Sequence, residues 1–213
     1  MPLDRAAAPP PTPIRVDLQV IADMIQHGSR VLDIGCGDGA LLGYLGQFKQ
    51  VDGRGIELSQ KGVNASVAHG LSVIQGDADT DLKDFPSGAF DYAVLSQTLQ
   101  ATRDPRQVLQ QLVRIGRRAI VSFPNFGCWK VRVHMLRHGT MPVTQALPEK
   151  WHSTPNIHLC TILDFVELCE EIGIYIERGM IFMAGGRMRP IHSKRVANFI
   201  GEQGLFLLRR KTN

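Results

Sequence analysis

Three closely spaced glycines follow a short apolar run at residues 30–39, RVLDIGCGDG. Glycine permits positive φ angles and lets a ligand approach the backbone without a Cβ in the way. Apolar residues then recur at helical spacing over 40–45, so we expect a helix to begin directly after the glycines, with its free N–H groups directed toward the loop. A strand, a tight turn and a helix in this order are typical of a loop that binds a nucleotide cofactor.

The acid inside this run, Asp33, helps to choose between cofactors. Gly35, Gly37 and Ala40 also satisfy the spacing of a dinucleotide fingerprint, so the glycines alone leave NAD open. A carboxylate two residues before Gly35 would repel a pyrophosphate, whereas it suits the ammonium and the cationic sulfonium of S-adenosylmethionine. We therefore expect S-adenosylmethionine or S-adenosylhomocysteine here; a turn that merely joins strand to helix is the structural alternative. The expected binding residues of the loop are Asp33, Gly35, Cys36, Gly37 and Gly39.

Further candidate residues lie at the ends of the next three expected strands. Glu57 lies near the end of a strand expected over 51–58, where its carboxylate can accept hydrogen bonds from both hydroxyls of a ribose. Asp77 and Ala78 follow a strand expected at 71–75, and they offer a carboxylate and a backbone N–H to an adenine edge. Ser96 follows a strand expected at 90–95. Open α/β sheets bind ligands at the carboxyl ends of their strands, so one edge is expected to hold all four residues.

The order of apolar patterns predicts an α/β fold, a parallel sheet covered by helices on both faces. We expect one domain over 14–213, with a fifth strand at 119–123 and two last strands at 174–183 and 205–210. Residues 124–160 interrupt the alternation with two tryptophans, several histidines and prolines, and a short amphipathic helix expected at 129–136. Their position after the fifth strand suits a substrate cover or a partner surface. Residues 1–13, rich in alanine and proline, are expected to be a disordered arm.

Charge is divided unevenly along the chain. The first 106 residues carry 9 Lys and Arg against 13 Asp and Glu, whereas residues 107–213 carry 15 against 7, and the whole has a net charge of +4. The basic residues are dispersed and no nucleic-acid motif accompanies them, so we do not expect nucleic-acid binding. No apolar run approaches the length of a membrane span, so no membrane partner is expected either.

The cysteines and histidines give little sign of a metal site or of disulfides. The 4 cysteines lack the short paired spacing of zinc sites and disulfide frameworks, which fits a reducing cytoplasm. His152, His158 and Cys160 cluster in sequence, but no second cluster completes a tetrahedral set, so we expect no metal. His152 and His158 are the best candidates for a catalytic base, and a role in loop structure is the favoured interpretation of both.

The motifs VLDIGCGDG, Glu57, GDAD and FDYAVLS occur in the order found in class I S-adenosylmethionine-dependent methyltransferases, which the chain resembles over residues 30 to 210. This resemblance implies a doubly wound, Rossmann-like sheet of seven strands, whose last strand is antiparallel and inserted between the fifth and sixth. It also implies cofactor contacts at Asp33, Gly35, Gly37, Glu57 and Asp77.

A narrower resemblance is carried by SQTLQ (96–100), IVSFPNFGCW (120–129), GTMPVT (139–144) and TPNIHLCTILDF (154–165). These segments are similar to the MetW family of methionine biosynthesis proteins. The resemblance implies an association with homoserine O-acyltransferase, the enzyme that acylates homoserine ahead of sulfur incorporation, and support of its activity.

The sequence leaves three functional interpretations open. The first is a cofactor-binding accessory subunit of homoserine O-acyltransferase, which lets the end product of the pathway act on its first step. The second is an active methyltransferase for a small molecule. A missing catalytic base does not exclude the second, because methyl transfer from an activated donor depends largely on alignment. An NAD-binding protein is the third interpretation.

Overall fold

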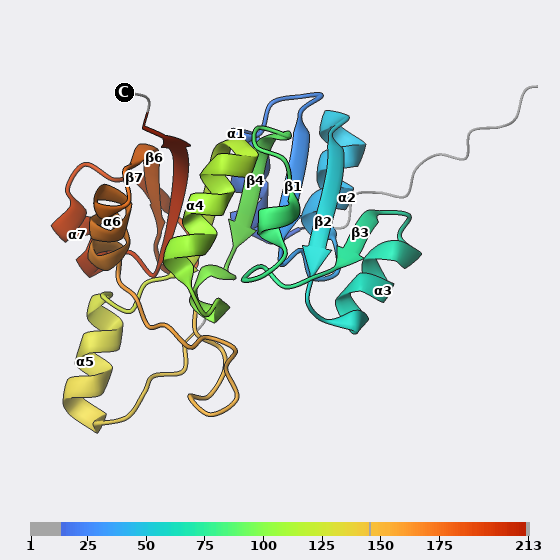
Figure 1. Ribbon diagram of the computed structural model, residues 1–213. Coiled ribbons are helices and arrows are strands. Elements are labelled where there is room, and N and C mark those ends of the chain that lie inside the picture. Colours follow the sequence, from blue (N-terminus) through green and yellow to red (C-terminus); the bar gives the residue numbers. More distant parts are fainter. Residues whose placement is uncertain (1–13, 145, 212–213) are drawn as a thin grey trace, which may run out of the picture.

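Strand and helix alternate through the first half of the chain, as the apolar pattern predicts, and they build one sheet (Figure 1). The computed structural model describes residues 14–144 and 146–211. The elements of this first half are α1 (Val16–Met24), β1 (Arg30–Ile34), α2 (Ala40–Lys49), β2 (Asp52–Glu57), α3 (Gln60–Ala68), β3 (Ser72–Gln75), β4 (Phe90–Ser96), α4 (Pro105–Ile115) and β5 (Gly116–Pro124). Each predicted strand of this half is present within one to three residues of its predicted bounds.

The second half is less regular. It contains α5 (Trp129–His138), α6 (Ile162–Glu171), β6 (Ile174–Phe182), β7 (Met188–Pro190), α7 (Lys194–Ile200) and β8 (Gln203–Arg210). Local chemistry explains where α6 begins, because the Thr161 side chain accepts a hydrogen bond from the amide of Asp164, whose carboxylate accepts one from the amide of Thr161. Thr161 and Asp164 therefore form a capping box, whose spacing of three residues is a recognisable sequence pattern.

The sheet has the order β3-β2-β1-β4-β5-β8-β6-β7. Strands β1 to β5 pair in parallel, and β8 lies antiparallel between β5 and β6. The sheet order expected of a class I methyltransferase is therefore confirmed. One strand was not predicted. β7 has three residues in the glycine-rich, basic segment 185–195, and it pairs only with Met180–Phe182 at the edge of the described sheet. The described sheet consequently has eight strands instead of seven.

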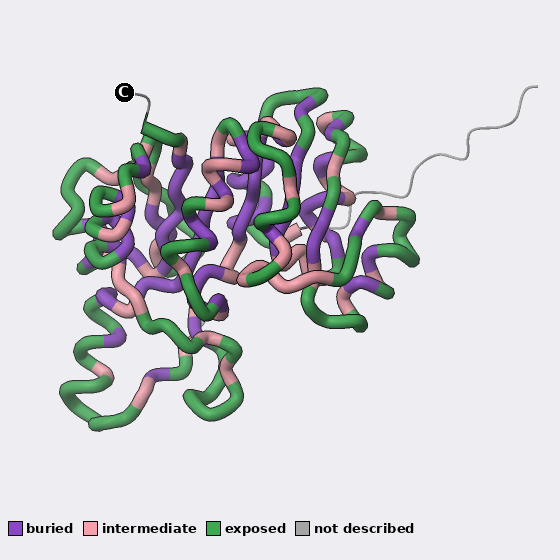
Figure 2. The backbone as a smooth tube through the Cα atoms, viewed as in Figure 1, coloured by how far each residue is buried: buried purple, intermediate pink, exposed green. Residues whose placement is uncertain are grey.

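Two apolar layers cover the two faces of the sheet. One layer unites α1 and α2 with side chains such as Val31, Val94 and Leu205, and the other unites α4, α6 and α7 with Leu32, Leu95 and others. A smaller cluster of Leu42, Val63 and Val73 attaches α3. Figure 2 shows the central strands buried between these helices. The predicted doubly wound α/β class is thus confirmed.

The segment between β5 and α6 projects beyond the carboxyl ends of the parallel strands, and Figure 2 shows it largely exposed. Its helix α5 corresponds to the helix expected at 129–136. The predicted arm, residues 1–13, lies outside the described residues. Among the residues that the structure describes, no helix is long and apolar enough to cross a membrane.

Candidate functional site

The glycine loop joins β1 to α2, and its shape depends on backbone angles that side chains rarely adopt. Gly35, Gly37 and Gly39 have φ angles of 71°, 58° and 79°. A Cβ at Gly35 would lie 2.5 Å from Thr98 Oγ1, and a Cβ at Gly39 would lie 2.3 Å from a methyl of Leu71. At Gly37 no atom would come within 4 Å of the added Cβ, so this part of the backbone is open to a ligand.

Asp33 lies on β1 just before this loop, and its carboxylate is almost completely enclosed. The residue is 2% exposed, and its Oδ1 atom has no hydrogen-bond partner among the described residues. Burial, with a smaller contribution from the charge of Glu57, raises the pKa of Asp33 to about 7. A buried carboxylate oxygen without a donor is energetically unfavourable, so this position fits a ligand that brings a cation or an N–H group.

Glu57, at the end of β2, is bonded to the loop. Its Oε2 accepts a hydrogen bond of 3.0 Å from the amide of Gly37, and its Oε1 accepts one of 2.8 Å from the amide of Ser59. The amides of Gly35 and Cys36 are also engaged, both with the carbonyl oxygen of Ile56 at 2.8 and 3.2 Å. The β2 strand therefore fixes the loop from the side, and each oxygen of Glu57 keeps acceptor capacity for a ligand hydroxyl.

Asp77 and Ala78 follow β3 on the same edge of the sheet. The amide of Gly76 donates to the carbonyl oxygen of Glu57 at 3.1 Å, which holds the start of this turn beside β2. The Asp77 carboxylate accepts a hydrogen bond of 2.9 Å from the amide of Asp79 and so stabilises its own turn. Ala78 is partly buried and packs on the main core.

The end of β4 contributes Ser96 and a residue whose role the sequence did not indicate, Gln97. Ser96 Oγ lies 3.2 Å from Ser122 Oγ on β5. Gln97 has a positive φ of 55°, and its side chain donates a hydrogen bond of 3.1 Å to Asp17 of α1. Asp17 is buried and also accepts two hydrogen bonds from the guanidinium of Arg15, at 3.1 and 2.9 Å. Gln97 and Asp17 are 80 residues apart, so no local sequence pattern could predict their contact.

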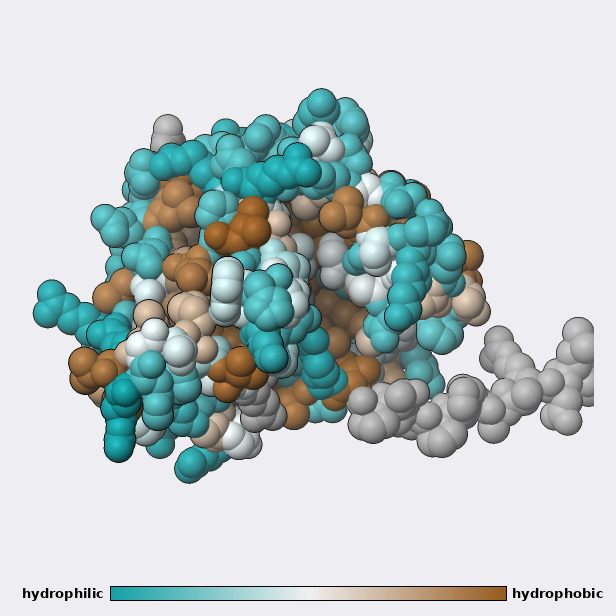
Figure 3. Space-filling view, turned by 90° about the horizontal axis from the view of Figure 1, so that it is seen from below, coloured by the Kyte–Doolittle hydropathy of each residue, from teal (hydrophilic) through white to brown (hydrophobic). Residues whose placement is uncertain are grey.

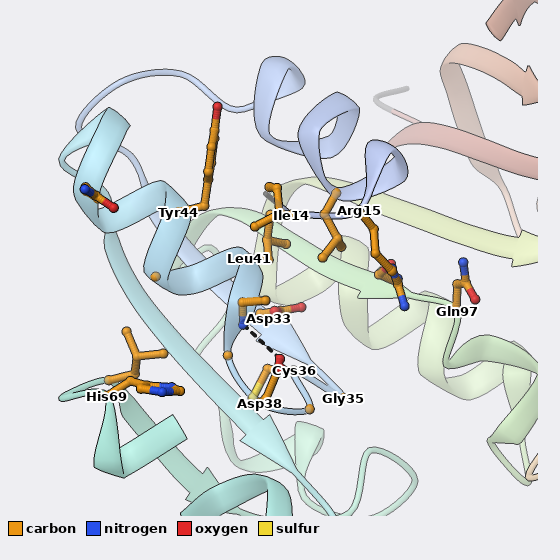
Figure 4. A pocket seen from close by; sticks show the side chains of 18 of the residues that line it. Ile14, Arg15, Asp33, Gly35, Cys36, Asp38, Leu41, Tyr44, His69 and Gln97 are labelled. Carbon is orange, nitrogen blue, oxygen red and sulfur yellow. Dashed lines mark hydrogen bonds between the residues drawn. The ribbon is translucent and has the colours of Figure 1, made fainter. Parts of the chain in front are cut away.

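A cavity of about 740 Å³ joins most of these groups. Six predicted residues line it, namely Asp33, Gly35, Cys36, Gly37, Gly39 and Ser96. Glu57, Asp77 and Ala78 are absent from its lining, although Glu57 is bonded to it through Gly37. In the view of Figure 4, Arg15 and Gln97 lie at one end of this cavity, and Tyr44 and His69 lie at the other. Sequence reasoning did not select these four residues.

A second cavity of about 410 Å³ lies under the segment between β5 and α6. Its lining is mainly apolar and includes Phe126, Met141 and Trp151, and it shares Gln97 with the first cavity. Figure 3 looks onto this side of the molecule, where apolar side chains lie among hydrophilic ones and the surface is hollowed. His152 and His158 line neither cavity; His152 lies against the ring of Trp151, and His158 Nε2 lies 3.2 Å from the carbonyl oxygen of Arg103.

Burial raises the pKa of each of the four cysteine thiols above its ordinary value. Burial, followed by the charges of Asp33 and Glu57, raises the pKa of Cys36 to about 12, so its place before a helix does not activate the thiol. Its Sγ faces Gly55, where an added Cβ would lie only 2.7 Å away, so it fills a tight space. Within 14–144 and 146–211, no group of three or more His, Cys, Asp or Glu side chains is placed to hold a metal ion.

Comparison with known proteins gives a family match over nearly the whole described chain. Residues 15–208 match the family model described as "Methionine biosynthesis protein MetW". A curated relative from Rhodopirellula baltica, the "Bifunctional methionine biosynthesis protein MetXA/MetW", is 33% identical over 195 residues, which cover 86% of this chain. The aligned part is only 31% of that relative's length, so the chain spans about a third of the protein it matches.

Solved structures share the fold at low sequence identity. A Thermotoga maritima S-adenosylmethionine-dependent methyltransferase, described as a possible histamine N-methyltransferase, is 15% identical with a TM-score of 0.67, over 92% of this chain and 88% of that one. The [4+2]-cyclase SpnF is also 15% identical, with a TM-score of 0.65 over 92% and 81% of the two chains. A methyltransferase and a cyclase therefore share this architecture, so the architecture alone does not decide the chemistry.

Proposed function

The chain belongs to the MetW family of methionine biosynthesis proteins, and from this premise we propose that it binds S-adenosylmethionine at the glycine loop and acts as an accessory, regulatory partner of homoserine O-acyltransferase. The observation that carries the cofactor part is the buried Asp33 carboxylate with its unpartnered oxygen, beside a loop open at Gly37.

The amino-acid end of the ligand fits between two opposite charges. Asp33 offers an acceptor to an ammonium group, and Arg15 lines the same cavity with a guanidinium. The ion pair with Asp17 engages Arg15 through Nε and Nη2, which leaves the donors on Nη1 for a ligand carboxylate. A zwitterionic amino acid satisfies both groups, whereas a pyrophosphate would meet the repulsion of Asp33. This charge arrangement favours S-adenosylmethionine or S-adenosylhomocysteine over NAD.

The nucleoside end fits the neighbouring strand ends. Glu57 is held by two backbone amides and is oriented before any ligand arrives, so its free lone pairs are ready for ribose hydroxyls. Asp77 and Ala78 lie beyond it in the turn that Gly76 anchors to β2. When bound, S-adenosylmethionine would supply a methyl group activated by the sulfonium; in the regulatory role it acts only as a ligand.

The partner is inferred from the family and from the bifunctional relative. That relative is named for a MetXA part and a MetW part in one chain, and the present chain matches about a third of it. Fusion keeps two parts at a high effective concentration, which is useful when they act together. We assign the MetXA part to homoserine O-acyltransferase and expect the present chain to support the same enzyme as a separate subunit.

The test is the rate of homoserine acylation by the acyltransferase of the same organism, measured with and without this chain and with and without S-adenosylmethionine. A rate that rises on adding the chain supports the accessory role, and a rate that then depends on S-adenosylmethionine supports regulation. The Asp33→Ala variant should lose the dependence on S-adenosylmethionine. An unchanged rate in all four mixtures would contradict the accessory role.

One observation favours a second candidate function, methyl transfer to a small molecule. The second cavity meets the first at Gln97, so an acceptor in it would lie beside a cofactor in the other. Incubation of the chain with labelled S-adenosylmethionine and a metabolite extract tests this activity. A labelled small-molecule product that forms with the wild type but not with Asp33→Ala would support the methyltransferase. If no product forms and the chain stimulates the acyltransferase, the accessory role is favoured.

A further inference from the structure

Helix α5 stands away from the sheet (Figure 1). Of its ten residues only Val131 is buried, in a small cluster with Cys128 and Leu147. The helix is nevertheless well formed, since Gly139 ends it in the left-handed conformation and donates its amide to the carbonyl oxygen of Met135. The helix is therefore an ordered projection and not part of the core.

The apolar side of this helix faces away from the body of the molecule. Trp129, Val133 and Leu136 follow one another at helical spacing, so they form one stripe on the side opposite the buried Val131. They are 42%, 39% and 86% exposed. An amphipathic helix normally turns its apolar stripe toward its own core. Here the stripe is left uncovered by the described residues, and such a patch marks an interaction surface.

The charges around the stripe define what can cover it. Helix α5 contains Lys130, Arg132 and Arg137 and no acidic residue. Lys130 is paired with Glu202, so its charge is already compensated, whereas Arg132, which donates to the carbonyl oxygen of Gly127, and Arg137 form no ion pair with a described residue. A complementary surface is an apolar groove with an acidic rim.

A second copy of this chain does not fit that description. A symmetric dimer formed through α5 would bring the cations of both helices to one interface, and α5 supplies no acidic residue to pair with them. A lipid surface fits poorly as well, because α5 has only ten residues and three apolar side chains on the stripe. A heterologous protein with an acidic, apolar groove satisfies both the stripe and the cations.

We infer that the outward stripe of α5, formed by Trp129, Val133 and Leu136, inserts into an apolar groove with an acidic rim on the acyltransferase. This inference rests on the proposed function, which supplies the partner. The inference adds the surface through which the two proteins meet. This surface lies on the segment between β5 and α6, which also supplies most of the lining of the second cavity. The α5 stripe would thus be separate from the glycine loop, so binding of the partner and of S-adenosylmethionine can be tested independently.

The experiment measures the affinity of the full chain for the purified acyltransferase by isothermal titration, with Leu136→Asp compared to wild type. Leu136 is 86% exposed, so the substitution does not disturb the core. The matched control is Val196→Asp on α7, where the side chain is 55% exposed. We expect Leu136→Asp to weaken the complex roughly tenfold or more, because the substitution removes an apolar anchor and places an unpaired charge in the interface. Val196→Asp should leave the affinity unchanged. Affinity for S-adenosylhomocysteine should be equal in all three proteins.

The charge part has its own variant. Arg137→Glu should weaken the complex, and high salt should weaken the wild-type complex. Equal affinities of wild type and Leu136→Asp would overturn the inference while leaving the proposed function intact. A wild-type chain that neither binds nor stimulates the acyltransferase would overturn both. The wild-type chain could instead dimerise or bind anionic phosphatidylserine vesicles. If Leu136→Asp abolished either of these interactions, the stripe would belong to another occupant and the inference would be overturned.

Discussion

The amide of Gly37 donates a hydrogen bond of 3.0 Å to Glu57 Oε2, which joins the glycine loop to the end of the neighbouring strand. The two residues are 20 positions apart, and the sequence predicts both as contacts of one cofactor. In the fold they form one unit, because Glu57 holds the loop in shape while it keeps lone pairs for a ligand. Changes at Glu57 should therefore affect both ligand affinity and the stability of the loop.

We expect Glu57→Gln to lower affinity for S-adenosylhomocysteine by roughly 10-fold or more, because a charged acceptor of ribose hydroxyls becomes a neutral one. An amide oxygen can still accept from Gly37, so the melting temperature should fall less than in Glu57→Ala. Isothermal titration and thermal denaturation of both variants measure this. Equal affinity of all three proteins would remove Glu57 from the binding site.

Asp33→Asn should weaken binding of S-adenosylhomocysteine more strongly than any surface change. The substitution removes charge-assisted hydrogen bonds that contribute roughly 1.5–3 kcal/mol, which corresponds to about 10- to 150-fold in affinity. Asp52→Asn is the matched control, since Asp52 is an exposed aspartate at the start of β2. The site assignment fails if the two variants bind equally well.

The same substitution should stabilise the ligand-free protein in a pH-dependent way. Burial raises the pKa of Asp33 from 3.8 to about 7, so the folded state holds a proton that the unfolded state releases between these values. The stability contributed by protonated Asp33 is therefore complete below about pH 4 and is lost as the pH rises through 7. Asparagine stays neutral, so Asp33→Asn should gain up to a few kcal/mol over wild type by pH 8. Urea denaturation at pH 4, 5.5, 7 and 8 tests this; a constant difference would contradict it.

Gly35→Ala should destabilise the fold through a specific contact with Thr98. The added Cβ would lie 2.5 Å from Thr98 Oγ1, on a backbone with a φ of 71°. Gly88→Ala is the control for the backbone angle alone, since Gly88 has a φ of 66° and open space around it. We expect Gly35→Ala to lose about 1–3 kcal/mol more than the control. The double variant Gly35→Ala/Thr98→Ala should recover part of that loss, and additive effects in this cycle would argue against the contact.

Trp151→Ala should reduce stimulation of the acyltransferase while affinity for S-adenosylhomocysteine is kept. Trp151 is highly exposed, lines the second cavity and has no part in the first. Exposed tryptophans are frequent anchors at interfaces. Tyr175→Ala on β6 is a control of similar character, because Tyr175 is another exposed aromatic residue. Loss of both stimulation and cofactor binding in Trp151→Ala would show that the two functions share one surface.

The parts of this fold that the sequence predicts are those that depend on local interactions. The glycines that need positive φ, the Thr161 capping box and the alternation of strand and helix all depend on neighbours within a few residues. The order of the sheet followed from motifs typical of a known family. The strand β7 escaped prediction because its three residues are exposed and carry no alternation, so only pairing with β6 creates it.

The sequence by itself predicted a candidate cofactor site at the carboxyl edge of the sheet, with the glycine loop, Asp33 and Glu57 among its residues. Tertiary structure decided the properties on which the proposed role of these residues depends. The burial that moves the pKa of Asp33, the contact of Gly35 with Thr98 and the hydrogen bond between Gln97 and Asp17, 80 residues apart, arise only when distant segments pack together. The outward direction of the α5 stripe is of the same kind. A pattern specifies that a helix has an apolar side, but the packing of the whole chain selects the side that is buried.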